Sequence, residues 1–333
     1  MIELLLFAVS AGLAYLLTPI VANVMVRIGH VRPDVHKQGQ PKVPYSGGVA
    51  LYAVVLPMLI VAALLRPEAS LRALSLLSAT TIAFAIGLVD DFKVLGGKVK
   101  TVLTFLTVTP IVLAHALFPG AIPLGRPLVP FIGRLRITLI YWVLLPFITA
   151  APANVVNMLD VFNGVMPATS LLTVFSMVIA SVILGERQGV LLLVPLAGAL
   201  LGYLPYNRWP ARIFNGDSGS LMVGAYIGAA AALLQLEYVT AVALLPHLLN
   251  GALIIISVGG FKEHREMKGR PVIVLPDYRL AASDNLEAPI SLVRIILTLE
   301  GPLSERDLIK RLTGLSAVSA ILAVISSLLI PRR

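Results

Sequence analysis

The segment GLVDDFKVLGGKVK, residues 87–100, separates two long apolar runs and carries two adjacent carboxylates followed by three lysines. One Asp at the centre of a lipid-embedded helix costs about 2.5–3.5 kcal/mol. We therefore expect Asp90 and Asp91 at a membrane boundary, facing protein or water. Carboxylates bind metal ions or protons, and lysines bind phosphate as point charges. Taken alone, the segment is also compatible with a solvated loop that ends a transmembrane helix.

The composition indicates a membrane protein. Of the 333 residues, 58% are hydrophobic and 13% are charged, and a soluble domain with this composition would expose large apolar patches. Repeated apolar runs of about 18–20 residues predict an all-α polytopic fold. The absence of cysteine excludes disulfides and thiolate chemistry. No basic stripe with interleaved aromatic residues occurs, which argues against a nucleic-acid partner.

About ten transmembrane helices are predicted in one integral membrane domain, residues 1–333. The first apolar run lacks a preceding basic segment, so we interpret it as a retained helix rather than a cleaved signal. A long polar segment, 258–313, is expected to be a loop within the domain. The predicted spans are 2–26, 47–65, 71–89, 101–118, 135–152, 165–184, 190–204, 220–235, 239–257 and 314–330.

Charge distribution predicts the orientation. The loops that follow the odd-numbered spans carry most of the 26 Lys and Arg residues. Because cytoplasmic loops of membrane proteins are enriched in these residues, we expect these loops in the cytoplasm and both termini outside. The polar motifs described below lie in the same loops, so the catalytic loops are expected on the cytoplasmic face.

The first of these loops contains PKVPYSGG, residues 41–48. Its prolines and paired glycines predict a loop that a ligand's phosphate or a nucleotide could approach closely. A tight turn into the second span explains the same residues equally well.

Four polar side chains follow one another at the end of the fifth span, at Asn154, Asn157, Asp160 and Asn163. In a helix, Asn154 and Asn157 share one face, and Asp160 lies one turn further along. Amide and carboxylate oxygens bind hard metal ions and polar ligands. Hydrogen bonding between helices is the structural alternative, but four such groups together favour function.

The segment FNGDSGS, residues 214–220, leads into another apolar helix. Asp217 or Ser218 could cap this helix. A helix N-terminus also favours anions, and a carboxylate there could hold a divalent cation that bridges to phosphate.

The long polar segment begins with FKEHREMKGRP, residues 261–271, a basic cluster that contains His264. Arginine side chains match phosphate oxygens in geometry, so the cluster could hold a diphosphate. Anchoring to anionic lipid headgroups is the alternative.

In order and spacing, these motifs resemble the polyprenyl-phosphate N-acetylhexosamine-1-phosphate transferases. The likeness covers nearly the whole chain. Within the family the chain looks closer to the dolichyl-phosphate GlcNAc-1-phosphate transferase branch of archaea and eukaryotes, because Asn163-Gly164 and Glu263-His264-Arg265 are similar to motifs of that branch. The residues that carry the family likeness are Lys42, Gly47, Gly48, Asp90, Asp91, Lys100, Asn154, Asn157, Phe214 and Asp217.

The resemblance implies transfer of a sugar-1-phosphate, GlcNAc-1-phosphate first among the candidates, from a UDP-sugar to a membrane polyprenyl or dolichyl phosphate, with release of UMP. It would begin the assembly of lipid-linked oligosaccharides for N-glycans. The implied metal is Mg²⁺, with Mn²⁺ as an alternative. Three groups of residues are implied: catalytic Asp90, Asp91 and Lys100; metal-binding Asn157 and Asp217; and substrate-binding Lys42, Asn154, Asn163, Gly164, His264 and Arg265.

Two other functions stay open from the sequence. One is the same chemistry with another UDP-N-acetylhexosamine, for a cell-envelope polymer. The other is a lipid or solute transporter, although transporters usually contain repeated halves and a site near the middle of the membrane. We expect an archaeal plasma membrane, or the endoplasmic reticulum if the chain is eukaryotic, and a homodimer is one option for assembly.

Overall fold

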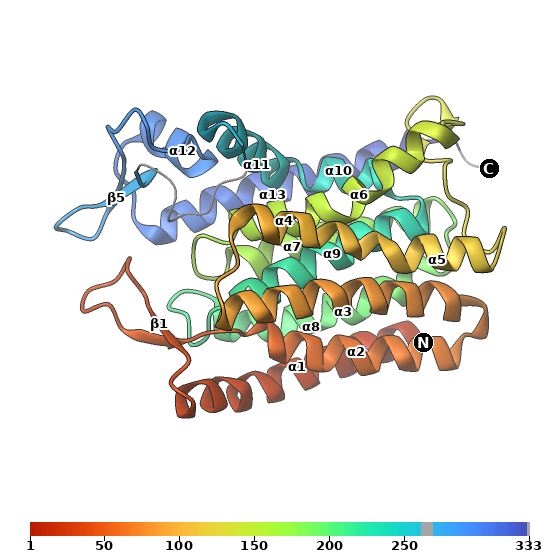
Figure 1. Ribbon diagram of the computed structural model, residues 1–333, viewed down its shortest axis with the longest axis horizontal. Coiled ribbons are helices and arrows are strands. Elements are labelled where there is room, and N and C mark those ends of the chain that lie inside the picture. The colour runs from red at the N-terminus through yellow and green to blue at the C-terminus, as the bar shows by residue number, and fades with distance from the viewer. Residues whose placement is uncertain (261–268, 332–333) are drawn as a thin grey trace.

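The computed structural model describes residues 1–260 and 269–331, a bundle of long helices with three small antiparallel hairpins (Figure 1). The helices are α1 (Ile2–Arg27), α2 (Gly48–Leu65), α3 (Ser70–Phe92), α4 (Gly97–Thr104), α5 (Thr109–Leu117), α6 (Thr138–Leu159), α7 (Val165–Ile183), α8 (Gly189–Asn207), α9 (Gly216–Leu234), α10 (Glu237–Ala243), α11 (Leu245–Val258), α12 (Leu292–Glu300) and α13 (Glu305–Leu328). The hairpins are β1 (Val31–Pro33) with β2 (Lys42–Pro44), β3 (Leu128–Val129) with β4 (Gly133–Arg134), and β5 (Val272–Val274) with β6 (Leu280–Ala282).

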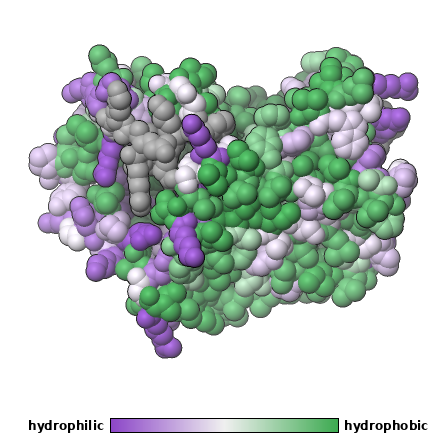
Figure 2. Space-filling view, in the orientation of Figure 1, coloured by the Kyte–Doolittle hydropathy of each residue, from purple (hydrophilic) through white to green (hydrophobic). Residues whose placement is uncertain are grey.

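The helices confirm the predicted class, a polytopic helical membrane protein. Within the described residues, nine helical segments are long and apolar enough to cross a membrane, or ten if α10 and α11 form one span bent by 72°. The predicted span 101–118 consists of α4, a short 3₁₀ turn and α5. Pro110 lies in the first turn of α5 and Pro246 in the first turn of α11. Proline is tolerated in the first turn of a helix, but it has no N–H to donate in the helix interior. Hydrophobic side chains form a broad band across the surface, as Figure 2 shows.

Helix α9 lies at the centre of the bundle, packed against α3 and α6, and 94% of its apolar window is buried. Small residues make this close packing possible, as is common between membrane helices. A side chain at Gly87 of α3 would overlap the backbone of Asp217 and Ser218 at the start of α9. The carboxyl end of α3 and the amino end of α9 are therefore in direct contact.

Both termini lie at one end of the bundle, and the β1–β2 hairpin, the start of α4 and strand β5 lie at the other (Figure 1). The ends of α3, α6 and α8 meet the starts of α4, α7 and α9 at this second end, which we call the site end. A chain with both termini on one side of a membrane crosses it an even number of times. The assignment of the site end to the cytoplasm stays a prediction.

The long polar segment contains more regular structure than the sequence suggests. Helix α13 begins at Glu305, nine residues before the predicted start, and the Ser304 side chain caps it by accepting the Asp307 N–H at 3.2 Å. Its first turns are too charged to be recognised as part of a membrane span, but Leu308 and Leu312 are buried in a small core shared with α12. Amphipathic packing, rather than uniform hydropathy, explains the helix here.

Candidate active site

Asp91, at the end of α3, binds the start of α9. Its Oδ1 accepts the backbone N–H of Asp217 at 2.6 Å, and its Oδ2 accepts the hydroxyl of Ser218 at 2.6 Å and its N–H at 3.4 Å. The residue at the helix's own capping position, Asn215, makes no such bond. Gly216 has a φ of +69°, and a side chain there would lie 2.5 Å from Asp91. Asp91, not Asp217, therefore caps this helix from a neighbouring element.

Asp90 and Asp217 share one lysine. The Lys100 ammonium on α4 donates to Asp90 Oδ2 at 3.2 Å and to Asp217 Oδ2. Asp90 Oδ1 also accepts the backbone N–H of Leu95 at 2.5 Å, which fixes the turn between α3 and α4. Two carboxylates that are distant in sequence thus face a single positive charge.

Asn157, near the end of α6, completes the cluster. Its amide nitrogen donates to Asp217 Oδ1 at 3.0 Å and to the Ser220 hydroxyl at 2.8 Å. These bonds fix the orientation of the Asn157 amide. Its oxygen, Oδ1, accepts no hydrogen bond from the part of the chain that the structure describes. Asn157 lines a cavity, so this oxygen is free to bind a ligand.

The cavity at the site end has a volume of about 660 Å³, within the usual range for small-molecule sites. Its walls combine the acidic cluster with basic and apolar side chains. The charged and polar lining residues include Asp90, Asp91, Lys100, Asn157, Asp217, Arg32, His36, Tyr45 and Arg270; the apolar ones include Val94, Val161, Phe162, Ile254 and Ile255. A ligand with an anionic head and an apolar part matches such a lining.

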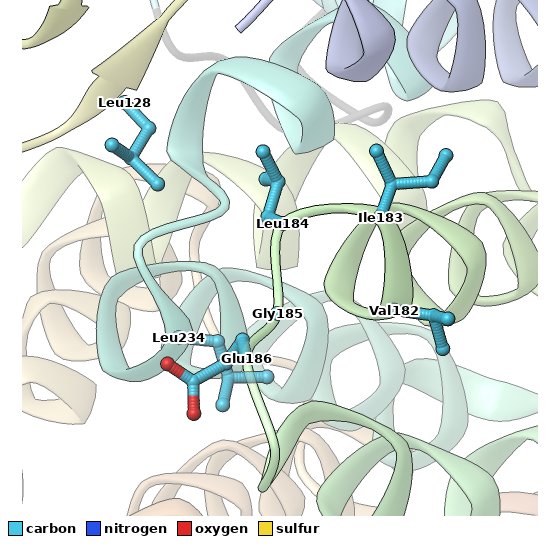
Figure 3. Close-up of a pocket in the computed structure, with 7 residues that line it drawn as sticks. All are labelled: Leu128, Val182, Ile183, Leu184, Gly185, Glu186 and Leu234. Atoms are coloured by element: carbon cyan, nitrogen blue, oxygen red, sulfur yellow. The ribbon is translucent and has the colours of Figure 1, made fainter. Parts of the chain in front are cut away.

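A second cavity, about 440 Å³, lies at the opposite end beside the turn between α7 and α8 (Figure 3). Most of its lining is aliphatic, and its one carboxylate, Glu186, pairs with Arg72 at 3.0 Å. The described residues that line it offer no unpaired acid, base or metal ligand, so the cavity at the site end is the better candidate for an active site.

Residues 73–235 match the model of glycosyl transferase family 4. This part of the chain is similar to glycosyl transferase family 4. The matched segment runs from α3 through the end of α9, so it includes Asp90, Asp91, Lys100, Asn157 and Asp217. The family resemblance that the motifs indicated is thereby confirmed.

Relatives of two kinds share similarity with this domain. A protein of Saccharolobus solfataricus, provisionally named UDP-N-acetylglucosamine–dolichyl-phosphate N-acetylglucosaminephosphotransferase, is 25% identical over 97% of this chain and 96% of its own length. The phospho-N-acetylmuramoyl-pentapeptide-transferase of Clostridium novyi is 27% identical over 69% of this chain and 72% of its own length. The enzyme of that name from Clostridium kluyveri is 37% identical, but over 35% of this chain and 38% of its own length.

The other residues predicted for the site differ in how they relate to the cavity. Lys42 is exposed on β2 and is not among the residues that line the cavity. Asn154 borders the cavity, but its amide nitrogen donates to Thr104 Oγ1 and to Ala150 O, both at 2.8 Å, and thus ties α6 to α4. His264 and Arg265 lie outside the described residues.

Asn163 and Gly164 belong to a second polar network, beside the cavity. Gly164 begins α7 with a φ of +81° and donates its N–H to the side chain of Asn207 at 3.1 Å. The Asn163 amide donates to Asp34 Oδ2 at 3.0 Å. Lys37 pairs with Asp34, and with Glu305 at 3.2 Å. Here the structure joins the first loop to the starts of α7 and α13.

This network contains a group of side chains that could in principle bind a metal ion. Ligand atoms of Asp34, His36 and Glu305 lie within 4.8 Å of one another. However, Lys37 already pairs with both carboxylates, and Trp209 Nε1 donates to Glu305 Oε2 at 3.0 Å. A metal ion would have to displace the ammonium group. We therefore interpret the network as a structural tie.

Replacing Glu305 by alanine is expected to destabilise the fold. It leaves the Lys37 ammonium and the Trp209 N–H without their partner, and breaking a buried ion pair costs about 3–5 kcal/mol. The melting temperature in detergent should fall by about 5 °C or more. Glu300→Ala is the matched control, because its pair with Arg311 is exposed and should contribute little. Equal melting temperatures for the two variants would contradict a structural role.

Asp160 lies just beyond the end of α6, and the Asn215 amide donates to both of its carboxylate oxygens, at 2.8 and 2.9 Å. Burial raises the pKa of Asp160 to about 7, and the negative charges of Asp217 and Asp91 act in the same direction, against the hydrogen bond from Asn215. The carboxyl group therefore holds its proton more tightly in the folded protein than in the unfolded chain.

This raised pKa predicts a stability change with pH. At pH values below about 4, Asp160 is protonated in both states, so its contribution to stability is complete; it is lost as the pH rises toward 7. The melting temperature of the parent should fall between pH 5 and 8 more steeply than that of Asp160→Asn, which cannot ionise. Parallel slopes for the two proteins would show that Asp160 has an ordinary pKa.

Several cavity residues were not identified as site residues from the sequence, namely Arg32, His36, Tyr45 and Arg270. Tyr45 lies within PKVPYSGG and Arg270 within FKEHREMKGRP, so both segments were recognised, although neither residue was singled out. Arg32 and His36 precede PKVPYSGG in the same loop, where basic residues are common in any cytoplasmic loop.

Proposed function

We propose that this protein transfers GlcNAc-1-phosphate from UDP-GlcNAc to a membrane polyprenyl phosphate of the dolichyl type, with release of UMP, as a first step of lipid-linked oligosaccharide assembly. One observation carries the proposal: side chains from α3, α4, α6 and α9 meet at one end of a membrane bundle in a single cavity. The full-length similarity to the S. solfataricus protein supports the choice of donor and acceptor.

A divalent cation, Mg²⁺ or alternatively Mn²⁺, fits the residues present. Asp217 offers a carboxylate, and the free Oδ1 of Asn157 offers an amide oxygen, which are ligands that these ions prefer. Lys100 donates to both Asp90 and Asp217, so the ion would share the Asp217 carboxylate with the lysine, and the open Asn157 oxygen would supply the ligand that the Asp34 network lacks. When bound, the ion would neutralise charge on the diphosphate.

The chain's own residues then position and neutralise the reacting groups. Lys100 binds a phosphate of the donor as a point charge. Asp90, held by Lys100 and the Leu95 N–H, orients the acceptor phosphate. We assign little general-base catalysis to it, because a phosphate monoester has a second pKa near 6 and is mostly dianionic at pH 7. Asp91 keeps Asp217 in place through the start of α9.

The proposed membrane arrangement follows from this chemistry. The donor is water-soluble and the acceptor is a lipid, so the cavity must face both phases; its lining combines Arg32 and Arg270 with Ile254 and Ile255. We place the site end at the cytoplasmic face of a plasma membrane, archaeal by the likeness to the S. solfataricus protein. A eukaryotic chain would lie in the endoplasmic reticulum. A homodimer remains one option for its assembly.

The alternative donor is another UDP-N-acetylhexosamine for a cell-envelope polymer, which the similarity to bacterial phospho-N-acetylmuramoyl-pentapeptide-transferases favours. A panel of UDP-sugars, incubated with the purified protein, dolichyl phosphate and Mg²⁺, separates the donors by UMP release. We expect UDP-GlcNAc to give the highest kcat/KM, with no UMP in the absence of the lipid phosphate. Absence of UMP with every sugar and lipid would contradict the proposal. Uptake of an intact donor into vesicles would instead indicate transport.

A further inference from the structure

Arg32 lies on β1 at the rim of the cavity, with its side chain exposed to solvent. Its guanidinium carbon lies 5.3 Å from the centre of the Tyr45 ring, which also borders the cavity. Among the described residues, no carboxylate pairs with Arg32. An arginine over an aromatic face keeps its planar fork oriented, with N–H groups that remain available to a ligand.

The hairpin that carries Arg32 is fixed relative to the acidic cluster. The backbone N–H of Tyr45 donates to His30 O at 3.0 Å, and the His30 ring nitrogen Nε2 lies 2.9 Å from the Ser46 hydroxyl. The His30 ring also stacks on Phe92, with ring centres 4.2 Å apart and planes 12° apart. Because Phe92 directly follows Asp91 in α3, these contacts attach the hairpin of Arg32 to the end of the helix that carries the two carboxylates.

The charges around the cavity differ in kind. Lys100 lies within the cluster and is paired with Asp90 and Asp217. Arg32 adds a cation at the rim that pairs with no carboxylate of residues 1–260 and 269–331, and its fork matches two oxygens of one phosphate. Arg270 borders the same cavity. An exposed arginine fork that borders the same cavity as the acidic cluster indicates an anionic ligand.

We propose that Arg32 binds phosphate oxygens of a substrate at the rim of the cavity and thereby sets the affinity for that substrate. The inference rests on the proposed function and adds a phosphate-binding residue outside the matched family segment, which begins at residue 73. The phosphate can belong to the UDP-sugar or to the lipid acceptor. In either case Arg32 contributes to substrate binding, whereas the acidic cluster and Lys100 position the reacting atoms.

Steady-state kinetics of UMP release distinguish the two sources. Arg32→Ala should raise one KM about tenfold or more, with kcat changed less than threefold, because it removes one charge-assisted contact that is made equally in the ground and transition states. A change in the KM of the UDP-sugar assigns the donor phosphate, and a change in the KM of the lipid phosphate assigns the acceptor. Arg32→Lys should recover part of the affinity, since it keeps the charge but not the fork.

Arg27→Ala is the matched control, because Arg27 is an exposed arginine at the end of α1 that does not line the cavity. Thermal unfolding establishes that both variants fold. The inference is overturned if Arg32→Ala has both KM values within twofold of Arg27→Ala. Direct binding of UDP and of farnesyl phosphate to the same proteins gives a readout that does not require turnover. If the parent releases no UMP but Arg32→Ala binds either probe more weakly than the parent, the proposed reaction fails while Arg32 retains its role. If Arg32→Ala binds both probes as tightly as the parent, Arg32 has no such role.

Discussion

Replacing Asp217 by asparagine is expected to lower kcat about 10³-fold without unfolding the protein. The amide has nearly the same shape, but it removes the negative charge that faces Lys100 and Asn157 and that we propose holds the divalent cation. Losing one well-placed electrostatic group in an active site typically costs about 10²–10³-fold in rate. UMP release at saturating substrates, measured over a range of Mg²⁺ concentrations, tests this expectation.

Asp277→Asn provides the control for that experiment, because Asp277 is an exposed carboxylate that pairs with Arg279 on the polar segment. It should keep parental turnover and the same Mg²⁺ dependence. An Asp217→Asn protein with parental kcat and an unchanged Mg²⁺ requirement would remove the metal-binding role of Asp217.

Asp91→Ala is expected to reduce both stability and turnover. It leaves the N–H groups of Asp217 and Ser218 and the Ser218 hydroxyl without their acceptor. Loss of a helix cap costs about 0.5–2 kcal/mol, and each buried unsatisfied donor adds about 1–3 kcal/mol. A displacement of Asp217 by about 1 Å can lower kcat about 10²-fold. Thermal unfolding and kinetics on the same preparation measure the two effects together.

Asp91→Asn separates this capping role from direct contact with substrate. Its Oδ1 can still accept the Asp217 N–H, so we expect it to recover part of both the melting temperature and kcat. If Asp91→Ala kept the parental melting temperature but raised the KM of the lipid phosphate, Asp91 would act on the acceptor directly rather than through α9.

The class of fold and the acidic cluster could be predicted from the sequence for physical reasons. A lipid environment requires long apolar helices, so hydropathy alone locates most of the spans. It also makes polar groups near lipid costly, so Asp90, Asp91, Asn157 and Asp217 were recognisable as a group just beyond the ends of the predicted spans. Their convergence in one cavity follows from the shared end of the helices that carry them.

Other features depend on contacts between elements that no local pattern records. An aspartate before an apolar helix usually predicts that its side chain caps that helix. Here the start of α9 is capped by Asp91 from α3 instead, because Gly87 and Gly216 allow the two helices to touch. The early start of α13 depends on packing of Leu308 against α12. Arg32 was indistinguishable from any other basic loop residue until its position over Tyr45 was known.

Manganese binding to the detergent-purified protein tests most directly whether Asp217 and its neighbours form the site for a divalent cation and a sugar nucleotide. Electron paramagnetic resonance reports bound Mn²⁺, and its coupling to ³¹P reports contact with the diphosphate. We predict that UDP-GlcNAc increases Mn²⁺ affinity in the parent and in Asp277→Asn, that bound Mn²⁺ shows ³¹P coupling, and that both effects are lost in Asp217→Asn. Equal Mn²⁺ affinity and equal ³¹P coupling in Asp217→Asn would contradict the site described here.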